Sequence, residues 1–348
     1  MSDFEIKIIN PSGFENWNTD IQNFDSYSFF HTLEWCQVLT STYEYIPTYF
    51  CIIKNKKLSS VVPAMEINSK LTGKRLISLP FSDFCEPIFS SIDESETLKK
   101  SMLDYCRKHK LRYMEFRTSE TRFPYETEYF RTDLRHLLEI SADQQIIQKQ
   151  FSENTKRNIK AAIKEGVNIK ELNSVEGIKI FYELQCITRR KHGLPPQPKL
   201  FFDNIYRFII SKDKGQILIG YFKDKPVAAL MFFTFGEKVI YKFGASLADS
   251  LPKGSNHFLM WEAIKKFNNA GYKEFDFGRT ETNHDGLRRF KLGFGAEERI
   301  IYTSRFDVKK NSFLPVISKS TGSYNQIFKK LPLPILKLIG KTIYKHVG

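Results

Sequence analysis

The feature that most constrains the fold of this chain is a weak internal repeat. Two segments share one order of predicted elements: a β-hairpin with a polar turn, a further strand, an amphipathic helix and a short strand. In the first copy these elements are strands 50–53, 58–66, 74–79 and 113–118, with the helix at 94–109. In the second copy they are strands 217–222, 227–235, 239–244 and 273–280, with the helix at 256–269. The alternative is a chance likeness of two hairpins, but the whole order matches, which predicts two similar α/β domains.

The repeat divides the chain into residues 1–150, residues 151–307 and a tail of residues 308–348. We expect an α/β (α+β) fold in which each domain has a mixed sheet flanked by helices. A length of 348 residues fits two domains of roughly 150 residues each. Hydrophobic residues make up 41% and aromatic residues 14% of the chain, which is enough for two cores and excludes general disorder.

The net charge of +14 allows three kinds of partner: nucleic acid, anionic lipid, or a phosphorylated substrate. More than half of this charge lies in the tail, which has eight lysines and no acidic residue after Asp307. The two predicted domains therefore share the remaining +6, a modest excess that fits phosphate-bearing substrates. No RNA-recognition, KH, homeodomain or zinc-finger pattern supports a nucleic-acid-binding module.

The tail alternates apolar stretches with lysines, as in LPLPILKLI at 331–339. This pattern predicts a peripheral contact with an anionic membrane surface. The alternative is a helix packed on the body with its lysines in solvent. No apolar run approaches the ~18 residues of a membrane helix, and residues 1–10 lack a signal-peptide core. Five scattered cysteines without a CxxC pair indicate a reducing compartment, so we expect a cytoplasmic protein, peripheral at the inner face of the membrane.

Six motifs, in order along residues 30–295, resemble those of FemAB-like proteins. They are FHTLEW (30–35), SLPFSD (78–83), FSENTKRNI (151–159), RRKHGLP (189–195), FDFGR (275–279) and GLRRFKLGFG (286–295). The resemblance implies two tandem acyltransferase domains of the GNAT type, in agreement with the repeat. It is closer to the broad branch linked with polysaccharide and envelope biosynthesis than to the peptidoglycan-bridge aminoacyltransferases. Two features that the resemblance associates with the peptidoglycan-bridge enzymes are missing from the sequence. The turn at 36–39 carries no cation that could hold the diphosphate of a substrate, and no heptad repeat indicates a coiled-coil arm.

The resemblance implies that Lys291, in the Phe-Lys pair formed with Phe290, lies at the reacting carbonyl. A buried cation there stabilises the oxyanion of a tetrahedral intermediate; the alternative is a surface lysine in a basic stretch. Asp83, in the apolar loop 80–87, is the candidate base or amine-positioning group, and the alternative is a turn aspartate bonded to its own backbone. We count Trp35, Arg279 and Phe290 among the expected substrate-binding residues.

The donor site is expected at a loop that begins a helix. Enzymes of the GNAT type that use acetyl-CoA hold its pyrophosphate on a Gln/Arg-x-x-Gly-x-Gly/Ala loop, where backbone N–H groups and the helix dipole attract the anion. The matching loop here fits at Gly254 only, so an ordinary N-capped loop is the alternative. The predicted cofactor-binding residues are Lys253, Gly254, Ser255 and Asn256.

The acceptor site is expected to involve cations and one carboxylate. Arg189, Arg190 and His192 precede a proline-rich loop, where they are candidates for phosphate or sugar contacts; the alternative is a solvated helix end. Asp276 is expected either to bind substrate or to form an ion pair, with Arg279 as its candidate cation.

The predicted function is N-acyl transfer to an amine of a cell-envelope or exopolysaccharide precursor, by direct attack through a tetrahedral intermediate. The donor is acyl-CoA or aminoacyl-tRNA, and the acceptor is a small or lipid-linked amino sugar or peptide. No metal is expected, since no cluster has metal-ligand spacing. One alternative is a tRNA-dependent aminoacyltransferase of the peptidoglycan bridge. The other is a non-catalytic membrane-peripheral protein with degenerate GNAT domains.

Overall fold

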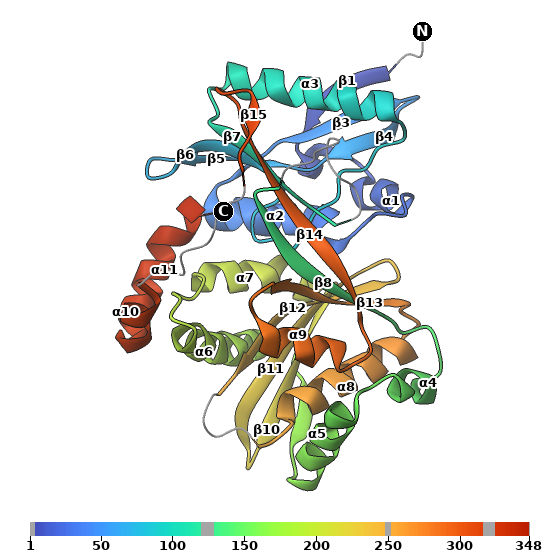
Figure 1. The fold of residues 1–348 in the computed structure, drawn as a ribbon, viewed down its shortest axis with the longest axis vertical. Coiled ribbons are helices and arrows are strands. Elements are labelled where there is room, and N and C mark those ends of the chain that lie inside the picture. Colours follow the sequence, from blue (N-terminus) through green and yellow to red (C-terminus); the bar gives the residue numbers. More distant parts are fainter. Residues whose placement is uncertain (1–3, 120–128, 248–251, 316–323, 348) are drawn as a thin grey trace. The chain divides into compact units, whose positions relative to one another are not determined.

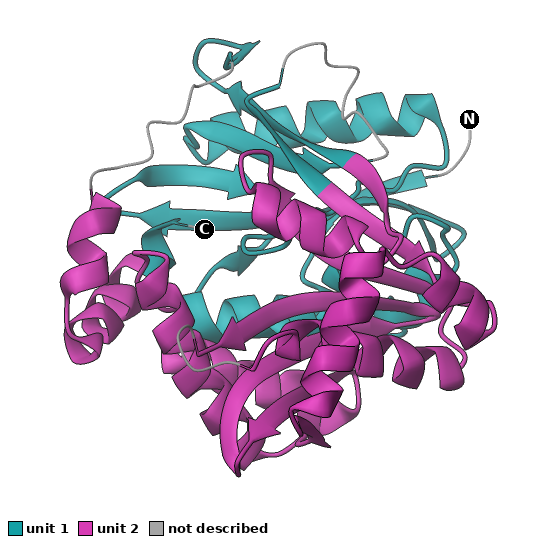
Figure 2. Ribbon diagram, turned by 60° about the horizontal axis from the view of Figure 1, so that its bottom comes forward, with its two compact units in different colours: residues 1–134, 300–319, 344–348 teal, residues 135–299, 320–343 magenta. Residues whose placement is uncertain are grey.

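A computed structural model describes residues 4–119, 129–247, 252–315 and 324–347. The chain forms two compact units, coloured separately in Figure 2. Unit 1 comprises residues 1–134, 300–319 and 344–348, and unit 2 comprises residues 135–299 and 320–343. The chain passes from one unit to the other within β8 (Arg131–Glu139), β14 (Glu297–Asp307) and α11 (Leu333–Val347).

Unit 1 begins with short elements and two hairpins. Its first part contains β1 (Phe4–Ile9), α1 (Trp17–Gln22), α2 (Leu33–Tyr43), β2 (Ile46–Pro47), β3 (Tyr49–Lys54) and β4 (Lys57–Val62), with 3-10 turns at Pro11–Gly13 and Phe29–His31. Its second part contains β5 (Met65–Ser69), β6 (Gly73–Ile77), α3 (Ile92–Lys108), β7 (Tyr113–Thr118) and β15 (Ser312–Phe313). Figure 1 shows α3 lying along these strands.

Two sheets build unit 1. The strands β1, β3 and β4 form an antiparallel three-stranded sheet, and β2, β5, β6, β7 and β14 follow one another in a second sheet. In that second sheet β6 and β7 are parallel, joined by the crossover helix α3. The core lies between α3 and the strands, where Leu98, Met102 and Cys106 meet Phe50, Leu76 and Phe116.

Unit 2 contains one sheet with helices on both faces. Its helices are α4 (Gln144–Lys149), α5 (Glu153–Lys164), α6 (Val175–Lys191), α7 (Lys199–Phe208), α8 (Ser255–Asn269), α9 (Asp285–Leu292) and α10 (Tyr324–Lys330), with a 3-10 turn at Ile210–Lys212. Its strands are β9 (Asn168–Glu171), β10 (Gly215–Phe222), β11 (Lys225–Phe235), β12 (Lys238–Ser246) and β13 (Glu274–Glu281). The order of these strands is β13-β12-β11-β10-β9, and β12 and β13 are parallel.

Both faces of β11 are buried, which explains its uninterrupted apolar run. Neighbouring residues point to opposite faces: Phe232 contacts Phe267 of α8, whereas Phe233 contacts Phe243, which packs on the phenylalanines of α6 and α7. Figure 1 shows α5 and α8 on one side of the sheet and α6 and α7 on the other.

The internal repeat corresponds to real structure. The order β5, β6, α3, β7 in unit 1 matches β11, β12, α8, β13 in unit 2, and in both the crossover helix joins two parallel strands. The prediction of one strand over 58–66 is wrong, because β4 and β5 belong to different sheets and Pro63, which has no N–H, lies between them. The unit boundaries also differ from the predicted domain boundaries, because β14 returns to pair with β7 through Tyr302–Asp307.

Candidate functional site

Lys291 lies on α9, a short amphipathic helix of unit 2. The helix begins where His284 Nδ1 accepts a hydrogen bond from the backbone N–H of Leu287. Next to Lys291, the ring of Phe290 packs edge-on against Phe294 at 5.3 Å between centroids, and against His257 of α8 at 4.8 Å. These contacts fix the rotation of α9 and turn Lys291 inward.

The Lys291 side chain is 1% exposed. Its Nζ donates to the carbonyl oxygen of Gly278 at 2.7 Å and to that of Arg279 at 3.2 Å. Gly278 has φ +70°, a left-handed conformation that glycine adopts without strain. Because removing an ammonium from water costs several kcal/mol before compensation, a lysine held this way indicates a functional site more than a surface residue.

A second polar group in unit 2, not predicted from the sequence, interacts electrostatically with Lys291. The fully buried ring of His136, on β8, has its Nε2 3.2 Å from Glu298 Oε2. Arg288 holds the same carboxylate with two hydrogen bonds of 2.6 and 2.8 Å. Burial first, and the nearby charge of Lys291 second, lower the pKa of His136 to about 4, which keeps the ring neutral near pH 7.

Two buried polar atoms of this part of unit 2 lack a hydrogen-bond partner in the described part of the chain. They are Nδ1 of His136 and Oγ1 of Thr280, the residue that follows Arg279 in β13. A buried polar atom without a partner costs about 1–3 kcal/mol. Such atoms beside a buried lysine are suited to contact a substrate.

Asp276 is buried on β13 and forms an ion pair, but with a different cation than expected. Its Oδ2 accepts from Arg135 Nε at 2.8 Å, and its Oδ1 accepts from the backbone N–H of Gly278 at 2.7 Å. The expected pairing with Arg279 is therefore replaced by Arg135, a residue of β8 whose proximity the sequence does not reveal. Through Gly278, Asp276 shapes the turn that holds Lys291.

Arg189, Arg190 and His192 lie at the C-terminal end of α6, as predicted. Arg189 Nε donates to the carbonyl oxygen of Pro195 at 3.3 Å and so braces the proline-rich loop. The ring of His192 lies 6.4 Å from that of His284, the N-cap of α9. Burial, and then the charges of His284, Arg189 and neighbouring lysines, lower the pKa of His192. Of the three predicted acceptor residues, His192 therefore lies beside the N-terminus of the helix that carries Lys291.

The predicted donor loop lies at the start of α8, as expected, and Lys253 and Asn256 are at least partly exposed. Gly254 has φ +82°, and a Cβ atom there would lie 1.9 Å from the carbonyl oxygen of Asn158 on α5. Ser255 is buried and donates to the carbonyl oxygen of Pro252 at 2.7 Å. Close packing of α5 on α8 is therefore sufficient to explain why residue 254 is a glycine, and no ligand needs to be invoked. The role of this loop in cofactor binding stays a prediction.

The other two predicted residues belong to unit 1. Trp35 is fully buried on α2, and its indole N–H donates to Ser82 Oγ at 2.9 Å. Asp83, the next residue, is partly buried. Leu79 and Phe81 of the same loop have φ of 42° and 62°, values that are strained for large side chains. Trp35 therefore anchors the loop of Asp83, and strain of this kind often occurs at functional sites.

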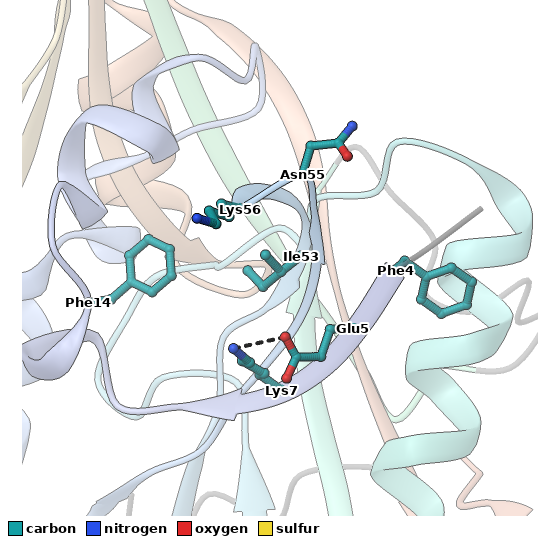
Figure 3. Close-up of a pocket in the computed structure, with 7 residues that line it drawn as sticks. All are labelled: Phe4, Glu5, Lys7, Phe14, Ile53, Asn55 and Lys56. Atoms are coloured by element: carbon teal, nitrogen blue, oxygen red, sulfur yellow. Dashed lines mark ion pairs between the residues drawn. The ribbon is translucent and has the colours of Figure 1, made fainter.

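A hollow of about 420 Å³ lies elsewhere in unit 1, at the edge of β1 (Figure 3). Its lining includes Lys7 and Glu5, which form an ion pair of 2.9 Å, and none of the predicted site residues. In the described part of the chain, no group of three or more His, Cys, Asp or Glu side chains is arranged to hold a metal ion. No described helix is long and apolar enough to cross a bilayer.

Comparison with known proteins places this geometry in context. Residues 149–298 match the acetyltransferase (GNAT) domain family. The lipid II:glycine glycyltransferase of Staphylococcus haemolyticus (strain JCSC1435) is 22% identical over 225 residues, which cover 44% of this chain and 53% of that protein. The chain thus matches about half the length of this curated relative.

Two solved structures share the fold. FemX superposes with a TM-score of 0.67 at 13% identity, covering 86% of this chain and 96% of FemX. A tandem GNAT protein from the clavulanic acid biosynthesis pathway superposes with a TM-score of 0.55 at 7% identity, covering 87% of this chain and 98% of that one. The tandem GNAT fold predicted from the sequence is confirmed.

Proposed function

We propose, from the premise that this chain is a FemABX-type GNAT acyltransferase, that it transfers an aminoacyl group to an amine of a lipid-linked cell-envelope precursor. The observation that carries the proposal is the buried ammonium of Lys291, held by the carbonyls of Gly278 and Arg279. A structural protein would gain more stability from an apolar side chain at this position.

In the proposed reaction the acceptor amine attacks the carbonyl carbon of the donor ester directly. The C–N bond forms first, which gives a tetrahedral intermediate and makes the carbonyl oxygen negative. The intermediate then collapses: the C–O bond to the donor breaks, the amine loses one proton, and the donor leaves as its protonated hydroxyl. Lys291 is proposed to donate a hydrogen bond to the oxygen that becomes negative in the tetrahedral intermediate. We expect no covalent enzyme intermediate, because all five cysteines are buried.

We assign His136 a positioning role in this reaction. A second positive charge next to Lys291 would lower the pKa of the lysine and favour loss of its proton. Burial keeps His136 neutral even though Glu298 favours the charged ring, and the hydrogen bond to Glu298 holds the ring in place, so that no second positive charge lies next to Lys291. Arg288 holds Glu298 in place through its two hydrogen bonds.

The other predicted site residues of unit 2 are proposed to bind the substrates. Arg189, Arg190 and His192 are proposed to bind phosphate groups of the acceptor, and Asp276 and Phe290 to hold the groups around Lys291. Aminoacyl-tRNA is favoured as donor because the curated relative is a glycyltransferase. Acyl-CoA on residues 253–256 is the second candidate, supported by the start of α8 and by Lys253.

Asp83 stays the proposed acceptor of the amine proton, supported by its strained loop and the Trp35 anchor. We place the reaction at the cytoplasmic face of the membrane, where a lipid-linked acceptor is accessible. The rival reading is a membrane-peripheral protein whose GNAT domains bind no donor. That alternative does not explain why the ammonium group of Lys291 is buried.

Thermal-shift measurements with full-length protein test the proposal. The ligands are aminoacyl-tRNA, acetyl-CoA and longer acyl-CoAs as donors, and undecaprenyl-linked and UDP-linked amino sugars or peptides as acceptors. A ligand that binds only the folded protein at a hundred times its Kd stabilises it by about 2.7 kcal/mol. We expect stabilisation by at least one donor and one acceptor. Stabilisation by neither class would refute the enzyme proposal, and stabilisation by acyl-CoA alone would replace tRNA as donor.

A further inference from the structure

Helix α11 presents an exposed face that combines aliphatic side chains with lysines. Ile335 is 46% and Leu338 64% exposed, and Lys341 and Lys345 are exposed on the same helix. The spacing of three to four residues from Ile335 to Lys345 places these four side chains along one stripe. We refer to Ile335, Leu338, Lys341 and Lys345 as the outer stripe.

The opposite side of α11 is packed tightly within unit 2. Leu336 is fully buried, and a Cβ atom at Gly340 would lie 2.0 Å from the carbonyl oxygen of Pro196. Lys337 Nζ lies 5.3 Å from the centre of the Tyr182 ring. The helix therefore meets the proline-rich loop through a small residue that permits close approach, and its orientation is fixed.

The C-terminal end of α11 is fixed within unit 1. The carbonyl oxygen of His346 accepts hydrogen bonds from Arg75 at 2.7 Å and from Thr72 at 2.8 Å, and that of Tyr344 accepts one from Tyr45. These donors satisfy carbonyl groups that a helix end leaves unpaired. The outer stripe is therefore preformed, and binding to it requires no ordering of a flexible tail.

We propose that the outer stripe of α11 docks the protein on an anionic lipid bilayer. Charge complementarity favours this occupant: the last 41 residues carry eight lysines and no acidic residue. In the described part of the chain neither Lys341 nor Lys345 forms an ion pair, so both charges remain available to lipid phosphates.

The side-chain chemistry distinguishes a bilayer from RNA. Every cation of residues 308–348 is a lysine, whereas RNA-binding surfaces favour arginine and stacking aromatic residues. Ile335 and Leu338 have no role against a phosphate backbone, but they can enter the boundary between lipid headgroups and acyl chains. Helix α10 adds exposed Ile327 (56%) and two further lysines, Lys329 and Lys330.

Docking of α11 on a bilayer extends the proposed function. It rests on that function in one respect, the choice of a lipid-linked acceptor. Binding is measured without donor or acceptor, so a failure to bind lipid leaves the transferase proposal intact. A failure to transfer likewise leaves the docking proposal intact.

The test is co-sedimentation of the full chain with two kinds of vesicle, phosphatidylcholine alone and phosphatidylcholine with about one third phosphatidylglycerol. Each lysine near an anionic surface contributes roughly fivefold in affinity. We expect Lys341→Gln/Lys345→Gln to lower affinity for anionic vesicles roughly 25-fold. The matched control, Lys212→Gln/Lys225→Gln, removes the same charge from exposed positions in unit 2 and is expected to bind like the wild type. We expect Leu338→Gln to lower the affinity for anionic vesicles by at least about fivefold.

Equal binding of the two double variants would overturn the proposal. So would binding of the wild type to tRNA, lost in Lys341→Gln/Lys345→Gln, in the absence of binding to vesicles. Self-association that Leu338→Gln abolishes, without any vesicle binding, would instead identify the stripe as a contact between two copies. Thermal melts of each variant show whether α11 remains packed, because none of the substituted side chains is buried.

Discussion

Replacing Lys291 by methionine removes the ammonium and keeps a side chain of similar length. The effect on stability is small, because two opposing terms are of similar size. The carbonyls of Gly278 and Arg279 lose a donor, which costs about 1–3 kcal/mol for each buried group left without a partner. The unfavourable burial of the ammonium, several kcal/mol, is removed at the same time.

The effect on turnover is large by comparison. Removing one oxyanion donor costs about 2.7–4 kcal/mol of transition-state stabilisation, which corresponds to a factor of 10²–10³ in kcat. We expect Lys291→Met to lower kcat by at least about a hundredfold, while the Tm stays within a few degrees of wild type. The substrate KM should change little, since the hydrogen bond forms fully only in the transition state.

The assay is steady-state transfer of labelled aminoacyl groups, with a thermal melt of each variant. The matched control is Lys164→Met, which removes an exposed lysine from α5 of the same unit and should retain full activity. Turnover of Lys291→Met within threefold of wild type would refute the role of the lysine. A large fall in Tm would show that the ammonium is structural.

Three further predictions concern buried charged groups and close packing within the two units. His136 has a pKa near 4 in the folded protein and near 6.5 in the unfolded chain. The stability that its neutral ring contributes is therefore fully present above pH 6.5 and is lost by about 1.4 kcal/mol per pH unit as the pH falls towards 4. His136→Gln should flatten this pH dependence in thermal melts at pH 7 and pH 5. Glu115→Gln breaks the buried carboxylate bound by two arginines and should lower the free energy of unfolding by about 3–5 kcal/mol, measured by urea titration. Gly254→Ala forces a side chain onto α5 at a left-handed position and should destabilise unit 2 by more than about 1 kcal/mol, whereas Gly271→Ala, at a similar φ with open space, should cost less. A smaller loss for Gly254→Ala than for Gly271→Ala would contradict the packing argument.

The repeat and the crossover helices could be read from the sequence because local patterns encode them. The period of apolar residues located α3 and α8, whereas Lys291 was singled out by the family resemblance and no helix was predicted over α9. The turn residues Asn55 and Asp224 have positive φ, as two-residue hairpin turns require.

The polar cluster around Lys291 could not be predicted in the same way. His136 on β8 lies 155 residues before Lys291 on α9 and 162 residues before Glu298 on β14, and no local pattern relates β8 to α9. Likewise Asp276 finds Arg135 and not Arg279, because a strand partner is nearer than the residue three positions along. The return of β14 to unit 1 depends on pairing with β7, a contact without a local signal.

The most direct test of the account is whether the wild-type protein makes an amide bond on an envelope precursor. Purified protein is incubated with labelled aminoacyl-tRNA and with undecaprenyl-linked precursors that carry a free amine, and the lipid fraction is counted after treatment with hydroxylamine. We expect label in the lipid fraction that resists hydroxylamine, as an amide does, and that falls at least about a hundredfold with Lys291→Met. Absence of labelled lipid with every donor and acceptor, or equal label with Lys291→Met, would contradict it.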